Sequence, residues 1–261
     1  MSPAASRPRG ASKQRLANMI AGQLRERILS GEIADGERLP PQEKLMNQFN
    51  VSQPSIREAL RMLEVDGLLT VRRGKSGGAI VHAPTSEVAA STIAAILQSR
   101  NVCLEDVGRA IQCLEPLCCE LAAKRRDRRR QLVPQLRRQL DLLVSAIDDP
   151  AEYRAKAASL HQDYIQGSGN DTLVLLVGAL ESLWSAHARS RASSGSWSRP
   201  VTRADRRRYT ANEIELVDAI EAGDAELARR LSAAHLKKAT RHSLVDDDQI
   251  GIEAALVLGG S

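Results

Sequence analysis

The chain has 261 residues, of which 43% are hydrophobic and only 2% are aromatic. This length suits one or two domains, and the scarcity of aromatic residues favours helices over sheets. No apolar run approaches the roughly 18 residues of a membrane span, and residues 1–10 lack the hydrophobic segment of a secretory signal. These features exclude a membrane partner and predict a cytoplasmic protein.

The formal net charge of +5 is distributed unevenly along the chain. Residues 1–82 hold 13 Lys and Arg against 8 Asp and Glu, a net of +5, whereas the remaining residues hold 24 of each. An excess of positive charge in one region favours binding of a polyanion such as nucleic acid. The distribution therefore predicts a polyanion-binding N-terminal domain joined to a neutral one.

An arm and two helices are the first predicted elements. Residues 1–12 are small, polar and Pro-bearing, which is typical of a disordered segment. Apolar residues at helical spacing follow, and their stripe ends at Ser30 and Gly31, a helix C-cap signal. A short second helix comes after Pro40 and stops at Asn50, a residue that suits a left-handed cap.

The third predicted helix opens with a polar turn. Ser52 is a suitable N-cap, and Pro54 is tolerated in the first turn of a helix. Two short strands, at residues 68–73 and 79–82, then surround a glycine-rich basic turn. Three helices followed by a β-hairpin predict a winged helix-turn-helix domain over residues 13–82.

A winged helix-turn-helix inserts the N-terminal end of its third helix into the major groove of DNA, so that end must be slim and able to hydrogen-bond. Serine and glutamine at this entrance can reach base edges or phosphates, and Gln can form a bidentate pair with adenine. Arginines one turn further in, and basic residues of the wing, can pair with phosphates. The predicted DNA-binding residues are Arg38, Ser52, Gln53, Ser55, Arg57, Arg61, Gly74 and Lys75.

The rest of the chain has a helical pattern without period-2 alternation. Residues 83–86 form a predicted linker, residues 87–244 an all-helical domain of six to seven helices, and residues 245–261 a tail without assigned structure. The fold class is thus mainly α. The candidate helices cover residues 87–99, 104–125, 132–147, 150–167, 171–190, 204–222 and 224–243.

The segments GERLPPQEKL and VSQPSIREALRMLEVDGLL, followed by the glycine-rich wing, resemble the GntR family of bacterial transcription regulators. The resemblance is specific because it fixes the turn, the helices and the wing in one register. This family often has Arg at the positions of Glu43 and Gln53, where relatives contact DNA. The two departures do not affect the expected fold, but they leave the operator sequence open.

Three C-terminal segments, VGRAIQCLEPLCCELAAKR, SLHQDYIQGSGN and ELVDAIEAGDAELARRLSAAHL, resemble the FadR-like branch of that family, which carries an FCD effector domain. Many members of this branch hold a metal with an Asp four residues before a His and two later His. His161 and His235 match this pattern, whereas Ala157 replaces the Asp and Glu213 replaces the intermediate His. The resemblance further implies that Arg109 meets the carboxylate of an effector.

Two imidazoles and one carboxylate suit a divalent ion such as zinc and leave positions open for water or a ligand. The predicted metal ligands are therefore His161, Glu213 and His235, and the same three residues with Arg109 form the predicted effector site. Alternatively the site holds no metal, and His161 and Glu213 hydrogen-bond to each other or to an organic effector.

Taken together, these patterns predict a homodimeric transcription repressor rather than an enzyme. Its expected partners are double-stranded DNA with a palindromic operator and a small carboxylate metabolite, and its expected location is the bacterial cytoplasm, on the nucleoid when DNA-bound. Two alternatives remain at this point. One is a metal-dependent hydrolase that uses His161, Glu213 and His235, and the other is a constitutive architectural DNA-binding protein without an effector.

Overall fold

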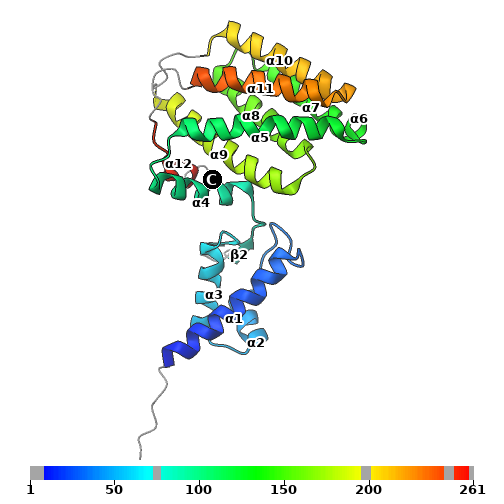
Figure 1. Ribbon diagram of the computed structural model, residues 1–261. Coiled ribbons are helices and arrows are strands. Elements are labelled where there is room, and N and C mark those ends of the chain that lie inside the picture. The colour runs from blue at the N-terminus through cyan, green and yellow to red at the C-terminus, as the bar shows by residue number, and fades with distance from the viewer. Residues whose placement is uncertain (1–8, 73–77, 195–200, 244–249, 259–261) are drawn as a thin grey trace, which may run out of the picture. The chain divides into compact units, whose positions relative to one another are not determined.

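The computed structural model describes residues 9–72, 78–194, 201–243 and 250–258. The chain divides into two compact units, residues 1–85 and residues 86–261 (Figure 1). The described residues form mostly helices, together with one two-stranded sheet. The mainly helical fold class expected from the sequence is therefore confirmed. None of the described helices is long and apolar enough to cross a membrane.

The first unit contains α1 (Arg9–Leu29), α2 (Gln42–Phe49), α3 (Gln53–Val65), β1 (Leu69–Arg72) and β2 (Gly78–Val81). The three helices and the hairpin share one hydrophobic core, in which Ile20, Leu45, Ile56 and Leu63 are almost completely buried. Each helix contributes one apolar face to this core, as expected for amphipathic helices. The arrangement is that of a winged helix-turn-helix.

The first helix begins earlier than the sequence suggested. Residues 9–12, which we expected within a disordered arm, belong to α1. They carry no apolar stripe, so periodicity gave no sign of helix there. A helix needs a buried face over only part of its length, because backbone hydrogen bonds extend it into solvent.

The wing is held by more than its hairpin. β1 and β2 are antiparallel, with Leu69 opposite Val81. On the other side of β2, the segment before α2 adds backbone hydrogen bonds from Gly36 N to Val81 O (2.9 Å) and from Leu39 N to Ala79 O (2.9 Å). β2 is therefore paired along both edges. Gly74 and Lys75, which come between β1 and β2 in the sequence, lie outside the described residues.

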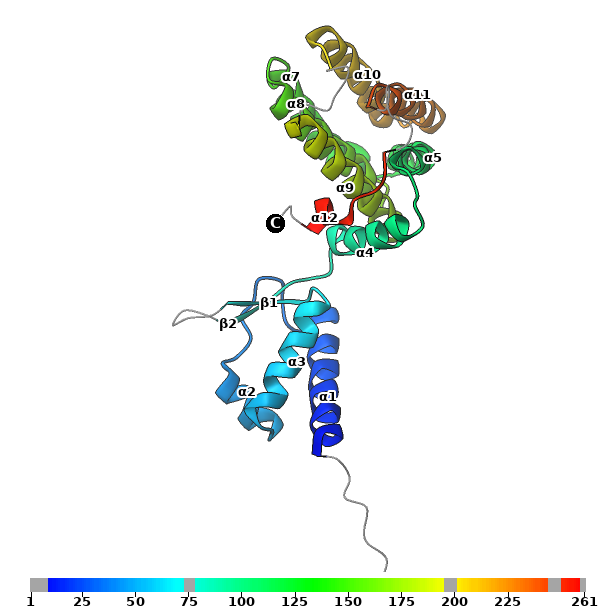
Figure 2. The same ribbon diagram turned by 90° about the vertical axis from the view of Figure 1, so that its left-hand side faces the viewer.

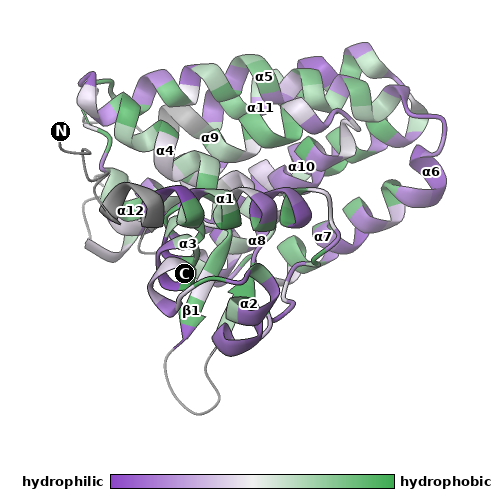
Figure 3. Ribbon diagram, turned by 90° about the horizontal axis from the view of Figure 1, so that it is seen from below, coloured by the Kyte–Doolittle hydropathy of each residue, from purple (hydrophilic) through white to green (hydrophobic). Residues whose placement is uncertain are grey.

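The elements found among the described residues of the second unit are all helices, as Figures 1 and 2 show. They are α4 (Ser86–Ser99), α5 (Leu104–Lys124), α6 (Arg128–Gln131), α7 (Val133–Ser145), α8 (Pro150–Gly167), α9 (Asp171–Ser194), α10 (Arg203–Ala222), α11 (Ala225–Ser243) and α12 (Ala254–Leu258). The central helix is α5, which packs against α8, α9, α10 and α11. In Figure 3 hydrophobic and hydrophilic residues alternate along these helices, the pattern of helices with one buried face.

Local signals fix the ends of the helices that carry the site. Asp149 is the N-cap of α8 and accepts hydrogen bonds from the backbone N–H groups of Ala151 and Glu152. Thr202 and Asp205 form a capping box at the start of α10. At its other end, Arg128 donates to the carbonyl oxygens of Glu221 and Ala222, which lack partners within the helix.

The C-terminal tail, left without structure in the sequence analysis, contains an ordered part. Residues 250–258 include α12, which packs against α4 and α9. A helix of five residues shows too little periodicity to be recognised in a sequence. Its side chains complete a hydrophobic cluster between α4, α5 and α9.

Candidate functional site

The exposed start of α3 carries most of the predicted DNA-binding residues. Ser52 is the N-cap and Gln53 the first residue of this helix, and both are exposed. Arg57 and Arg61 are also exposed and lie one turn apart, so they share a face of the helix. Arg38 is exposed as well, and its backbone pairs with that of Ile80 in β2.

Ser55 differs from this prediction. Its side chain is only 2% exposed, and its hydroxyl lies 3.3 Å from that of Ser52. The reason is helical geometry: Ser55 lies one turn before the buried Ala59 and therefore points toward the core of the unit. Ser55 shapes the entrance to α3 from within and does not present its hydroxyl to DNA.

The second unit contains a cavity of about 1010 Å³. Its lining comes from α5, α7, α8, α9, α10, α11 and α12 and includes apolar residues such as Ile111, Trp184 and Leu236. Among its polar residues are His161, Glu181, Glu213 and His235. A large, mainly apolar cavity with a few converging polar groups is the usual form of a small-molecule site.

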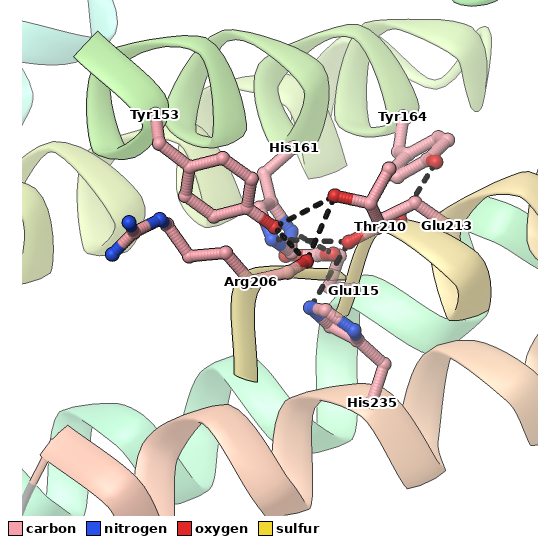
Figure 4. A network of polar contacts seen from close by, with 8 residues as sticks. All are labelled: Glu115, Tyr153, His161, Tyr164, Arg206, Thr210, Glu213 and His235. Carbon is pink, nitrogen blue, oxygen red and sulfur yellow. Dashed lines mark hydrogen bonds and ion pairs between the residues drawn. The ribbon is translucent and has the colours of Figure 1, made fainter. Parts of the chain in front are cut away.

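Three of the predicted site residues meet at this cavity (Figure 4). His161 comes from α8, Glu213 from α10 and His235 from α11. Oε1 of Glu213 lies 3.0 Å from Nε2 of His235 and 3.8 Å from Nε2 of His161. One donor atom from each residue falls within 4.8 Å of the other two, so the three could hold a metal ion together.

A second layer of side chains orients this cluster. Glu115 of α5 lies 2.6 Å from Nδ1 of His161, which leaves Nε2 of that ring toward Glu213. The hydroxyl of Tyr164 donates to Oε2 of Glu213 at 2.8 Å. Outer groups of this kind are typical of metal sites, because a ligating imidazole usually donates its other N–H to a carboxylate.

Aromatic residues gather around the cluster. Tyr164 and Tyr209 pack edge-on against His161 and His235, respectively. Tyr153, which lines the cavity, hydrogen-bonds through its hydroxyl to Thr210 (3.1 Å). All three tyrosines of the chain therefore lie at this site.

The charges of the cluster stabilise one another. Burial opposes a charged His161, but the charge and hydrogen bond of Glu115 outweigh it and raise the pKa of His161 to about 10. Burial likewise opposes a charged Glu213, yet the charge and hydrogen bond of His235 lower its pKa to about 2. Burial and the charge of Glu115 raise the pKa of Glu181. The cluster thus attracts positive charge, which protons or a metal ion can supply.

The residues present fit a divalent ion. Ligand atoms that share one zinc ion lie about 3.3 Å apart, close to the 3.0 and 3.8 Å between the oxygen of Glu213 and the two ring nitrogens. Among the described residues, Nδ1 of His235 is buried and has no hydrogen-bond partner. The nitrogen of His235 that lies beside Glu213 is Nε2, so the unpaired Nδ1 is the outer nitrogen, which in a metal site usually donates to a carboxylate or a carbonyl.

Comparison with known proteins matches both units. Residues 16–77 match the family described as "Bacterial regulatory proteins, gntR family", and residues 106–238, about half of the chain, match the FCD domain. The "Uxu operon regulator" of Haemophilus influenzae is 30% identical over 229 residues, which are 84% of this chain and 78% of its own. The chain belongs to the GntR family.

Other relatives agree with this assignment. The "HTH-type transcriptional repressor NanR" of Salmonella schwarzengrund is 26% identical over 243 residues, 91% of this chain and 89% of its own. The structure titled "Streptococcus agalactiae GntR" has a TM-score of 0.63 at 19% identity and covers 86% of this chain and 99% of its own, which supports the fold. The protein is a DNA-binding transcription regulator with an FCD domain. The alternative of a metal-dependent hydrolase is wrong, because the families and relatives that this chain matches are regulators.

One predicted effector residue of this GntR regulator is not brought to the cavity. Arg109 points to solvent, with 57% of its side chain exposed, and pairs with Glu105 and Asp106 of the same helix. The residues of α5 that line the cavity are Gly108 and Ile111, on a different face. Arg109 therefore lies outside the cavity, contrary to the expectation from the resemblance.

Two residues of the site were missed in the sequence analysis, namely Glu115 and Glu181. A signal was present in the sequence. Glu115 lies one turn after Ile111 and one turn before Cys119, inside an otherwise apolar stripe of α5. A carboxylate on the buried face of a helix needs a partner, so such a position marks a candidate for a functional site.

Proposed function

We propose that this GntR regulator is a homodimeric repressor whose FCD domain binds a small carboxylate effector through a divalent metal ion. The single observation that carries the proposal is the convergence of His161, Glu213 and His235 at the cavity. When bound, the ion would offer open coordination positions to an oxygen of the effector. Glu115 would hold His161 in the orientation that coordination requires.

The cavity also supports an anionic effector. Arg154 and Arg189 belong to its lining, and guanidinium groups suit planar carboxylates. Apolar side chains such as Trp184 and Leu236 would cover the organic part of the molecule. A cavity of this kind favours a ligand-controlled regulator over a constitutive architectural protein, since the latter has no use for it.

Metal content after dialysis tests the metal ligands. We expect the native protein to retain about one divalent ion per chain and His235→Ala to retain none. Arg109→Ala is the matched control, because it removes a charged side chain outside the cavity. Equal metal content in the native protein and His235→Ala would contradict the proposed ligand set.

A metal-free site is the second candidate, and a specific observation favours it. The cluster forms ion pairs of its own, between His161 and Glu115 and between His235 and Glu213. In that case the effector would bind by hydrogen bonds to this cluster. Effector binding would then survive treatment with a chelator. If the effector binds through a metal ion, the chelator would abolish its binding.

For DNA binding we propose that the exposed start of α3 reads a palindromic operator. Gln53 would contact bases, Ser52, Arg38, Arg57 and Arg61 would contact the backbone or base edges, and the wing would contribute Gly74 and Lys75. A two-fold operator requires a two-fold protein. The test is selection of bound fragments from genomic DNA, combined with a mass measurement that should give twice 28.4 kDa. Such a protein acts in the cytoplasm, on the nucleoid when DNA-bound.

A further inference from the structure

The segment Ile250–Leu258, called the strap below, runs along the second unit and is held by its backbone. The N–H of Leu104, at the start of α5, donates to the carbonyl oxygen of Ile250 at 2.8 Å. Next to it, Cys103 and Gly251 form an antiparallel bridge. The first part of the strap is thus joined to the beginning of α5 by strand-like pairing.

Side chains of α4 and α9 hold the middle of the strap. The N–H of Ala254 donates to Oε1 of Gln98, on α4, at 2.9 Å, and the N–H of Glu253 donates to Nε2 of His187, on α9, at 2.9 Å. The other ring nitrogen of His187 lies 3.0 Å from the carbonyl oxygen of Leu183 and donates to it. Both strap N–H groups lie at the start of α12, where a helix leaves such groups without internal partners.

The strap touches α4 and the cavity at the same time. Ile252 is 3% exposed and belongs to a hydrophobic cluster with Ala94 of α4 and Leu104 of α5. Five residues further along, Val257 lines the cavity together with Leu236 of α11. A ligand that fills the cavity to this wall therefore meets the strap.

We propose that the strap couples occupancy of the effector cavity to α4. An effector that displaces Val257 loosens the strap and breaks the hydrogen bond between Ala254 of the strap and Gln98 of α4. Because α4 begins at Ser86, directly after the last residue of the DNA-binding unit, a change in α4 reaches the linker through the chain itself. This inference concerns the regulation of the proposed effector site and rests on the proposed function.

Coupling between two sites is reciprocal, so the inference can be tested without knowing the effector. If loosening the strap weakens operator binding, operator binding must tighten the strap. The probe is then the operator duplex selected from genomic DNA, with a scrambled duplex of equal length for comparison. The readout is amide hydrogen exchange of residues 250–258 in the full-length protein, because exchange reports local opening.

In the native protein, we expect the operator to slow exchange of residues 250–258 about fivefold relative to the scrambled duplex, at the lower end of allosteric coupling. In Gln98→Ala without DNA, the strap should exchange about fivefold faster, since one hydrogen bond is lost, and the effect of the operator should disappear. Gln98→Glu is the matched control, because a carboxylate still accepts from Ala254. Residues 133–145 of α7 should not change in any of these proteins.

The outcomes separate this inference from the proposed function. If the native protein binds the operator specifically and the exchange of residues 250–258 does not change, the coupling is refuted and the regulator function stands. If residues 250–258 exchange at the same rate in Gln98→Ala and in the native protein, both without DNA, the hydrogen bond from Gln98 does not stabilise the strap and this part of the inference is refuted. Equal affinity for both duplexes would overturn the proposed operator binding and, with it, the coupling that rests on it.

Discussion

Glu115 and His161 lie 46 residues apart in the sequence and meet through a hydrogen bond of 2.6 Å between Oε1 and Nδ1. The side chain of Glu115 is 1% exposed, so this contact joins α5 to α8 inside the second unit. A carboxylate in such a place must be paired, because an isolated buried charge is costly. The pair fixes the imidazole ring and leaves its Nε2 toward Glu213.

The first prediction concerns the pH dependence of stability in the metal-free protein. The pKa of His161 rises from 6.5 to about 10 on folding, against the effect of burial, because of the charge and hydrogen bond of Glu115. A raised pKa stabilises the folded state fully below pH 6.5, and this stabilisation is lost as the pH rises through about 10. We expect the free energy of unfolding to fall by on the order of 5 kcal/mol across this window.

Urea denaturation after chelator treatment, at a series of pH values, measures this dependence. His161→Gln is the reference, because its amide does not titrate, and the difference between the two curves isolates His161 from other groups. If the free energy of unfolding depends on pH in the same way in the native protein and in His161→Gln, folding does not raise the pKa of His161.

The second prediction concerns a fourth metal ligand. Ala157 lines the cavity one helical turn before His161, so a carboxylate at this position would point toward the cluster. Ala157→Asp should tighten metal binding. In competition with a chelator, the metal ion should dissociate more slowly from this variant than from the native protein. Affinity should fall as the pH drops below about 10, because the metal must displace the proton that His161 holds in the metal-free protein. A variant that holds metal no more tightly than the native protein would place Ala157 outside the coordination sphere.

The third prediction separates base readout from backbone contacts in DNA binding. Gln53→Ala should reduce the preference for the operator by about 1–3 kcal/mol and affect random duplex little. Arg57→Ala should weaken binding to both duplexes, since a phosphate contact carries no sequence information. Ser55→Ala is the control and should leave both affinities unchanged, because its hydroxyl is buried. The affinities of the native protein and the three variants for both duplexes are measured by titration at one fixed salt concentration. An equal loss of affinity for both duplexes in Gln53→Ala would argue against base readout.

The fourth prediction concerns the turn between α10 and α11. Gly223 has a φ of +82° and lies against the guanidinium of Arg128. Gly223→Ala should lower the free energy of unfolding by about 1–2 kcal/mol, because an L-residue is strained in the left-handed region. The matched control is Gly22→Ala in α1, where an added Cβ meets nothing within 4 Å. That change should stabilise its own unit by about 1 kcal/mol, since Ala favours helix. Chemical denaturation followed by circular dichroism measures both, and a stabilised Gly223→Ala would contradict the strain at this turn.

The positions of the long helices could be predicted from the sequence because each buries one continuous apolar stripe. The segment expected at residues 150–167 is α8 with the same bounds, since Pro150 and the cap at Asp149 define its start. The winged helix-turn-helix was predictable for a related reason: its turns depend on residues with special backbone preferences, such as Asn50, whose φ is +51°. Local chemistry and periodicity together determine these elements.

The details of the site depend on which helices meet, and one sequence contains no direct record of that. His161, Glu213 and His235 were grouped only through a family resemblance, and the structure brings them together. Arg109 shows the limit of that approach, because its position on α5 turns it to solvent. Glu115 was overlooked since its partner is far away in the sequence. Only packing of α5 against α8 makes the pair visible.

The gathering of tyrosines around the cluster gives the protein an optical property. Tyr153, Tyr164 and Tyr209 are the only tyrosines in the chain, and Trp184 lines the same cavity. The phenol of Tyr164 is hydrogen-bonded directly to Glu213. Tyrosine absorbance therefore arises at the ligand-binding site alone, whereas Trp197 and Phe49 also contribute to the near-ultraviolet dichroism. Occupancy of the cavity can be followed in the unlabelled protein through this absorbance, without a dye or a reporter residue that would disturb the packing.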